Sequence, residues 1–154
     1  MKRGLNPELG LAILRVVLGV IFIAHGYPKI AGGVAGTGEF LGQLGIPLAG
    51  FFAWVVTLLE VFGGIALVIG FLVTPVALLL SFHMLVGIVL VHAPNGFYVI
   101  GPGQGGIEFN LLLIAGLLAL VLVGPGMAAL DSRAGDAGEP ISPAGEAGAE
   151  GPES

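Results

Sequence analysis

The sequence has no cysteine and few charged residues. Of its 154 residues, 10% are charged and none is a cysteine. Without cysteine the chain cannot itself form disulfides, thiolate metal sites, iron–sulfur clusters or a dithiol relay. Its lysines and arginines number only 5 and form no basic patch, so nucleic acid is not expected as a partner.

Apolar residues take the place of the missing charges. They make up 56% of the chain, and the mean hydropathy is +1.04. Because a soluble domain has about 25% charged residues, this composition predicts an integral membrane protein. The net charge of −5 comes from the C-terminal residues, which are otherwise rich in Gly, Ala, Pro and Ser. Such a composition cannot bury a core, so we predict a disordered acidic tail over residues 131–154.

Four segments are apolar and long enough to cross a bilayer, which takes about 20 residues. They cover roughly residues 8–30, 49–71, 75–93 and 107–127. We therefore predict an all-α fold in which residues 1–130 form an integral membrane four-helix bundle. In the connection after the first span, Phe40, Leu41 and Leu44 have helical spacing, which predicts a short helix in the membrane interface.

Four spans place both termini on the same side of the membrane. Lys2 and Arg3 favour a cytoplasmic N-terminus, whereas Lys29 at the far end of the first span opposes it. We predict a multi-pass protein of the plasma membrane with both termini in the cytoplasm.

The first span carries a polar stripe. At 100° per residue, Arg15, His25 and Lys29 fall within an arc of about 80° on one helix face. A face of this kind is costly to expose to lipid and suits a pocket inside a bundle. The other helices are therefore expected to face it.

A rise of about 1.5 Å per residue sorts the polar side chains by depth into two groups. Near the middle of the membrane lies a candidate catalytic group of Arg15, Glu60 and His83. Near the outer face lies a candidate substrate or vestibule group of His25, Lys29, His92 and Glu108. In the second group, Lys29 and Glu108 either extend to the water interface or line a vestibule together with His25.

Glu60 is the most informative of these residues. A lone carboxylate in hydrocarbon is protonated or paired, and Arg15 is its predicted partner. The pair either fixes the register of the helices or has a functional role. His83 either relays protons beside it or only forms a hydrogen bond across the bundle. His92 lies about 180° from His83 around a regular helix, so the two are not expected to face one pocket.

Two other kinds of site are weakly supported. No metal site is predicted, because the three histidines do not share a helical spacing. A haem between two histidines is left as an alternative. Residues 101–106 read GPGQGG and match the dinucleotide-binding pattern GxGxxG, but they precede a membrane span and no ribose-binding acid follows about 20 residues on. We interpret them as a flexible outer loop.

Several motifs in order along the chain resemble the DoxX family of small four-span membrane proteins. They are LRVVLGVIFIAHGYPKI, LGIP, VFGGIALVIG after Glu60, His83-Met84, HAPNGF, GGIEFNLLL and GPGMAALD. The resemblance covers nearly everything from Leu11 to Asp131 and implies a four-helix membrane bundle. The residues that match family-like positions are Arg15, His25, Gly26, Lys29, Glu60, His92 and Glu108.

The resemblance also suggests a function. DoxX-like proteins are associated with thiosulfate:quinone oxidoreductase and with membrane oxidoreductase complexes that handle oxidative or thiol stress. We therefore expect a quinone-linked redox subunit without a covalently bound cofactor, in which Glu60 and His83 move protons and Arg15 stabilises the anionic reduced quinone. Electrons, and any thiols, would come from a redox partner subunit. A non-enzymatic membrane scaffold or small-molecule carrier is the alternative, so whether the chain is an enzyme stays open.

Overall fold

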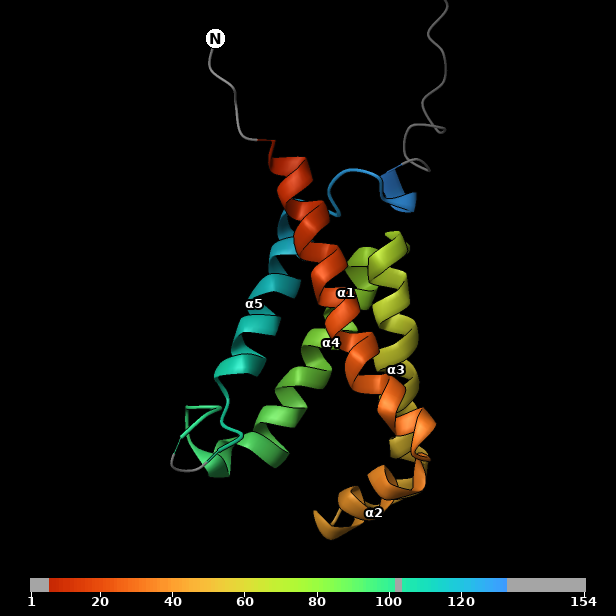
Figure 1. Ribbon diagram of the computed structural model, residues 1–154, viewed down its shortest axis with the longest axis vertical. Coiled ribbons are helices and arrows are strands. Elements are labelled where there is room, and N and C mark those ends of the chain that lie inside the picture. The colour runs from red at the N-terminus through yellow and green to blue at the C-terminus, as the bar shows by residue number, and fades with distance from the viewer. Residues whose placement is uncertain (1–5, 102–103, 133–154) are drawn as a thin grey trace, which may run out of the picture.

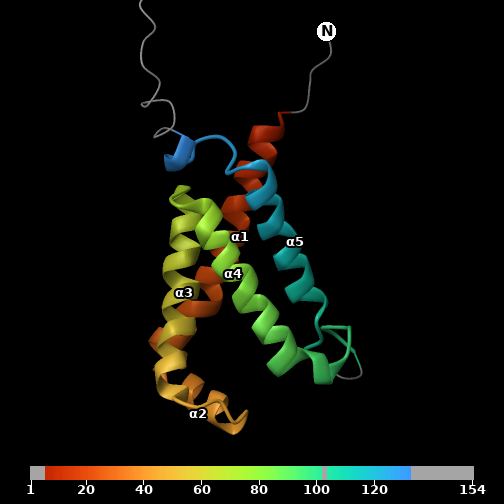
Figure 2. The same ribbon diagram turned by 180° about the vertical axis from the view of Figure 1, so that it is seen from behind.

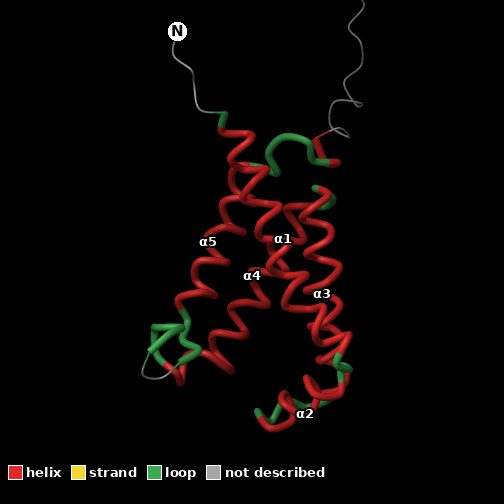
Figure 3. Tube along the Cα trace, in the orientation of Figure 1, coloured by secondary structure: helices red, strands yellow, loops and turns green. Residues whose placement is uncertain are grey.

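The computed structural model describes residues 6–101 and 104–132, and all regular secondary structure in that part of the chain is helical, with no strand in it. Figure 3 shows helix along most of the described chain, with loops gathered at the two ends. The elements are α1 (Pro7–Ala31), α2 (Ala35–Gln43), α3 (Ala49–Ile69), α4 (Val73–Gly87), a π-helical turn η1 (Ile88–His92), a 3-10 turn η2 (Ala93–Asn95) and α5 (Glu108–Val123). The predicted all-α fold class is confirmed.

Three helical segments are long and apolar enough to cross a membrane. They are Pro7–Ala31, Ala49–Ile69 and Val73–Asn95, with 25, 21 and 23 residues. The fourth apolar segment forms a shorter helix than the sequence predicts, since α5 has 16 residues and is about 24 Å long. The backbone leaves the helix at Gly124, whose φ of 113° is left-handed, and Pro125 follows directly.

The helices form two pairs. Helix α1 packs against α3, and α4 packs against α5. Both pairs meet at the end of the bundle where α1 begins, which we call the terminal end, and they diverge toward the opposite end, which we call the α2 end (Figures 1 and 2). The bundle is therefore closed at the terminal end and splayed at the α2 end.

Glycines allow α1 and α3 to approach closely. A Cβ on Gly19 would lie 2.6 Å from the carbonyl oxygen of Gly64, and a Cβ on Gly64 would lie 2.6 Å from that of Gly19. Seven residues further along α1, a Cβ on Gly26 would lie 2.6 Å from the Val61 side chain. Small residues are how membrane helices bring their backbones together, and here they fix the antiparallel register of the pair.

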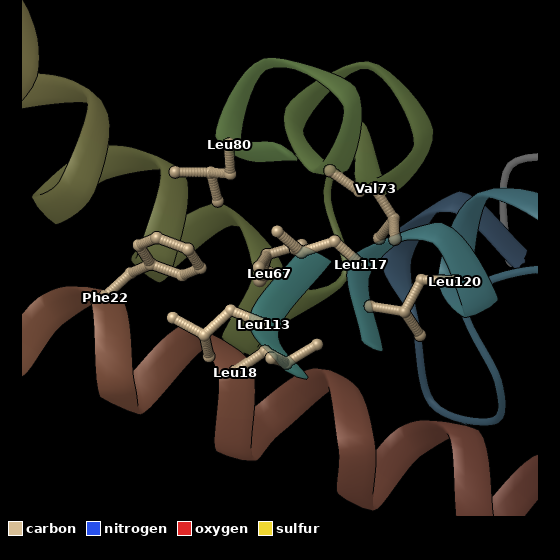
Figure 4. Close-up of a cluster of buried hydrophobic side chains, with 9 residues drawn as sticks. Leu18, Phe22, Leu67, Val73, Leu80, Leu113, Leu117 and Leu120 are labelled. Carbon is tan, nitrogen blue, oxygen red and sulfur yellow. The ribbon is translucent and has the colours of Figure 1, made fainter. Parts of the chain in front are cut away.

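The apolar core joins the two helix pairs in the closed part of the bundle. Leu67 of α3, Leu80 of α4 and Leu117 of α5 are fully buried against one another and against Phe22 of α1 (Figure 4). Outside this core the helices expose large apolar side chains such as Phe82, as expected for a surface in contact with lipid.

Helix α2 confirms the short helix predicted from the spacing of Phe40, Leu41 and Leu44. It packs on the beginning of α3 through a glycine, because a Cβ on Gly38 would lie 3.4 Å from the Cα of Gly50. None of its own residues is buried. Helix α2 therefore lies across the splayed end of the bundle without being part of the core.

The terminal end is closed by Asp131. Its two carboxylate oxygens accept hydrogen bonds from the backbone amides of Leu72 and Val73, both at 2.8 Å, and its own amide donates to the Gly70 carbonyl at 3.0 Å. These amides stand at the start of α4, where helical N–H groups otherwise lack partners. Asp131, the first residue of the predicted tail, is thus held against the bundle by a contact that sequence composition does not reveal. Residues 133–154, the rest of that tail, lie outside the described residues.

Replacing Asp131 with alanine is expected to lower the free energy of unfolding by about 1 kcal/mol, the usual effect of losing a helix cap. Thermal unfolding in detergent measures it. The neighbouring exposed Ser132 provides the matched control, and Ser132→Ala should leave the melting temperature unchanged. Equal shifts for the two variants would contradict a capping role for Asp131.

Candidate functional site

A cavity of about 640 Å³ lies at the α2 end, between the two helix pairs. Its walls come from α1, α2, α3, α4, η1 and α5, and most of the lining side chains are apolar. Its ionisable and amide side chains are His25, Lys29, Glu60, His83, His92 and Asn110. The cavity thus collects most of the polar residues of an otherwise apolar bundle.

Glu60 is the centre of the polar group. Its side chain is 6% exposed and contacts residues of two other helices, α1 and α4. Lys29 of α1 donates a hydrogen bond to Oε2 and forms an ion pair with the carboxylate. His83 Nε2 of α4 donates to Oε1 at 3.1 Å. A buried carboxylate is therefore paired and hydrogen-bonded, as a charge in this environment requires.

The predicted partner of Glu60 was Arg15, and that pairing is wrong. In the antiparallel register set by the glycines, Glu60 and Val61 lie opposite Gly26, one turn before Lys29. Gly26 brings α1 so close to α3 that the lysine side chain reaches the carboxylate. An estimate of depth for each residue could not reveal this pairing, because it does not include the offset between the two packed helices.

Arg15 lies at the terminal end, away from the cavity. It is 2% exposed, and its Nη2 donates to the Met127 carbonyl at 3.3 Å. Its Nε and Nη1 have no hydrogen-bond partner among the described residues. Gly70, with φ of 74°, leaves the space that Nη1 occupies. Arg15 therefore supports the closed end of the bundle and is not part of the polar group around Glu60.

His92 lines the same cavity as His83, contrary to the prediction from a regular helix. The reason is the π-helical turn Ile88–His92, in which each residue advances less around the axis than in an α-helix. Pro94 favours this distortion, because it has no amide hydrogen and its ring prevents a close approach to the carbonyl of Leu90. His92 Nδ1 then donates to the Gly105 carbonyl at 2.6 Å.

Of the other predicted vestibule residues, His25 lines the cavity and Glu108 does not. His25 lines the cavity, donates from Nδ1 to the Ile21 carbonyl at 2.8 Å, and stacks on Phe109 with ring centroids 6.0 Å apart. Glu108 does not line this cavity, since its carboxylate accepts from the Val99 amide at 2.7 Å and holds the loop before α5. The two predicted groups therefore merge into one around the cavity, which retains five of the seven predicted residues and excludes Arg15 and Glu108.

Asn110 was missed by sequence reasoning. It is 5% exposed on α5 and lines the cavity, and the one hydrogen bond of its side-chain nitrogen within the described residues goes to the sulfur of Met84, at 3.8 Å. Sulfur is a weak acceptor, so the amide retains capacity to bind a ligand. The signal that could have found it is an amide inside an apolar span, in the segment EFNLLL.

The remaining polar features agree with a structural role for the glycine-rich loop. The amides of Gly105 and Gly106 donate to the carbonyls of Val99 and Tyr98, so they are not available to cradle a phosphate. Within residues 6–101 and 104–132, no three histidine or acidic side chains gather as metal ligands would.

The fold and the cavity together define a small helical integral membrane protein, with a charged group buried at the inner end of an apolar cavity. A family model described as DoxX matches residues 10–93. The chain belongs to the DoxX family, as its motifs indicated.

Curated relatives extend the similarity over most of the chain. The chain is 33% identical over 124 residues to a Bacillus subtilis (strain 168) protein named "Putative oxidoreductase CatD", covering 80% of this chain and 86% of the relative. It is 32% identical over 126 residues to the Escherichia coli (strain K12) "Inner membrane protein YqjF", covering 80% and 91%. "Inner membrane protein YphA" of the same strain is 32% identical over 125 residues, covering 80% and 89%. No solved structure matches the chain.

Proposed function

We propose that this chain is the quinone-binding subunit of a membrane oxidoreductase complex. The observation that carries the proposal is the cavity of about 640 Å³, apolar along its walls and ending on the Lys29–Glu60–His83 group. A quinone has an apolar ring with carbonyl oxygens at opposite edges, so it needs this combination of apolar walls and hydrogen-bond donors. The name of the Bacillus subtilis relative, which includes the word oxidoreductase, supports a role in a redox reaction.

Four polar residues of the cavity have a proposed task. Lys29 and Asn110 donate hydrogen bonds to quinone oxygens, and the lysine charge stabilises negative charge that develops there. His83 and Glu60 hold and deliver protons at the same depth. The positive charge expected from Arg15 is supplied by Lys29 in this arrangement, because Arg15 lies outside the cavity.

Reduction of a quinone to a quinol takes up two electrons and two protons. We propose that the protons pass through His83 and Glu60 and that the electrons come from a redox-active partner subunit. With both termini in the cytoplasm, as the N-terminal charges favour, the cavity would lie toward the outer leaflet of the plasma membrane.

Quinone binding by the purified protein in lipid nanodiscs tests this proposal. The wild type should bind a quinone saturably. Glu60→Gln should insert normally and weaken binding about tenfold, or about 1.4 kcal/mol, because Lys29 and His83 lose the carboxylate that holds them in place. Glu39→Gln is the matched control, since this exposed carboxyl on α2 does not line the cavity. Normal insertion with unchanged binding would contradict the proposal. Failure of Glu60→Gln to accumulate would favour the scaffold function, in which the charge sets bundle geometry.

A further inference from the structure

The mouth of the cavity is mostly apolar. Phe40 of α2, Leu44 directly after it, Phe52 of α3 and Leu90 of η1 all line the cavity, yet they remain between 38% and 45% exposed. Side chains that both line a cavity and are exposed mark its opening. His25 of α1 also meets both conditions, but it stacks on Phe109 of α5 and its Nδ1 donates to the Ile21 carbonyl. The four apolar residues, which we call the portal residues, would form a contiguous apolar surface in contact with solvent if this side opened into water.

The position of α2 determines which way the portal faces. Helix α2 packs on the start of α3 through Gly38, and its side chains that line the cavity (Thr37, Phe40 and Leu41, with Leu44 directly after the helix) have helical spacing on a different face. Helix α2 therefore covers the cavity across the α2 end of the bundle. The exposed portal residues lie at α2 and α3 on one side and at η1 on the other. In Figure 2, α3 and α4 diverge toward this end of the bundle. The opening therefore lies to the side, between these two edges.

The neighbourhood of the portal is also apolar. Val89, next to Leu90 in the π-helical turn, is 64% exposed and does not line the cavity. Phe51, next to Phe52, is 62% exposed. The portal is thus continuous with a surface that in a membrane protein contacts acyl chains.

We propose that the cavity opens sideways into the lipid through the portal residues, and that its ligand is an amphiphile that enters from the bilayer. The polar head of this ligand lies at Lys29, Glu60 and His83, and its hydrocarbon chain passes out between α2 and η1 over Phe40, Leu44 and Leu90. The proposal rests on the proposed function for the head group and specifies the substrate class: a quinone that carries a long hydrocarbon chain, not a water-soluble one.

The first measurement tests the portal without any ligand. Because the chain has no cysteine, single nitroxide spin labels can be attached at Leu44→Cys and Leu90→Cys in nanodiscs. Val89→Cys serves as the control in lipid and Ser132→Cys as the control in water. Labels at Leu44 and Leu90 should collide with oxygen, which concentrates in lipid, as often as the label at Val89. Collision with a water-soluble nickel complex, as at Ser132, would overturn the sideways opening.

The second measurement compares two quinones that share one head group, of which only one carries a hydrocarbon chain. With concentrations expressed per volume of bilayer, the quinone with a hydrocarbon chain should bind the wild-type protein at least fivefold more tightly than the quinone without one. Leu90→Asn should remove this gain and leave the chainless quinone unaffected, whereas Val89→Asn should change neither. Equal affinities for the two quinones, or equal losses of affinity in the two variants, would overturn the proposed path of the hydrocarbon chain. If neither quinone binds, the proposed function and the chain path both fail, and the spin labels still decide the direction of the opening.

Discussion

Gly64→Ala is expected to lower the free energy of unfolding by about 3 kcal/mol, although it adds a single methyl group. That methyl would lie 2.6 Å from the carbonyl oxygen of Gly19 and 2.9 Å from the amide nitrogen of Ile23. Both are backbone atoms of α1, so no side-chain rotation relieves the contact and the two helices must separate. Overpacking of a rigid contact costs about 1–3 kcal/mol, and displacement of a whole helix pair places this variant at the upper end.

A second glycine of the same helix makes the comparison decisive. A Cβ on Gly50 would meet nothing within 4 Å, so Gly50→Ala carries no steric cost and improves helix propensity. In thermal unfolding in detergent, Gly64→Ala should therefore lower the melting temperature strongly, whereas Gly50→Ala should raise it slightly or leave it unchanged. Similar small shifts for both would show that α1 and α3 do not approach as closely as the glycines imply.

Lys29→Met is expected to be the most damaging change in the cavity. It leaves the Glu60 carboxylate, 6% exposed, without its cation. Breaking a buried ion pair in this way costs about 3–5 kcal/mol, and we expect about 3 kcal/mol because the lysine side chain is 27% exposed and partly screened. Glu60→Gln should cost less, since the lysine left behind can turn toward the cavity.

The double variant Lys29→Met/Glu60→Gln separates stability from binding. With both charges removed, no unpaired charge stays buried, so the melting temperature should recover most of what Lys29→Met loses. Quinone affinity should not recover, because the donor and the carboxylate are both gone. Additive losses of stability would show that the two side chains do not act as a pair.

The sequence predicted the elements of this fold well, because each has a local signal. Apolar length located the spanning segments, and the spacing of Phe40 and Leu44 located α2. The fourth span was overestimated, since apolar residues continue to Met127 while Gly124 already ends the helix. The polar residues that matter were also recognised, because an ionisable group in an apolar span is conspicuous.

Partners were predicted poorly, because they depend on register and on helix irregularity. Arg15 was chosen as the partner of Glu60 from its charge and its depth, and that choice is wrong because Gly19 and Gly26 set a register that places Lys29 there instead. The exclusion of His92 assumed 100° per residue through a segment that forms a π-turn. Such features depend on contacts between distant parts of the chain, which a reading of one helix at a time does not contain.

The two cations of α1 have consequences for the order in which the chain is completed during synthesis. Lys29 finds its carboxylate 31 residues later, when α3 is made. Arg15 is separated by 112 residues from Met127, the carbonyl that receives its hydrogen bond. Helix α1 therefore enters the membrane with a guanidinium whose partner is among the last residues described. Until that partner arrives, the unpaired charge is costly in lipid. Completion of the bundle thus coincides with arrival of the C-terminal segment, and a chain truncated before Met127 would present an unpaired arginine to the machinery that removes unfinished membrane proteins.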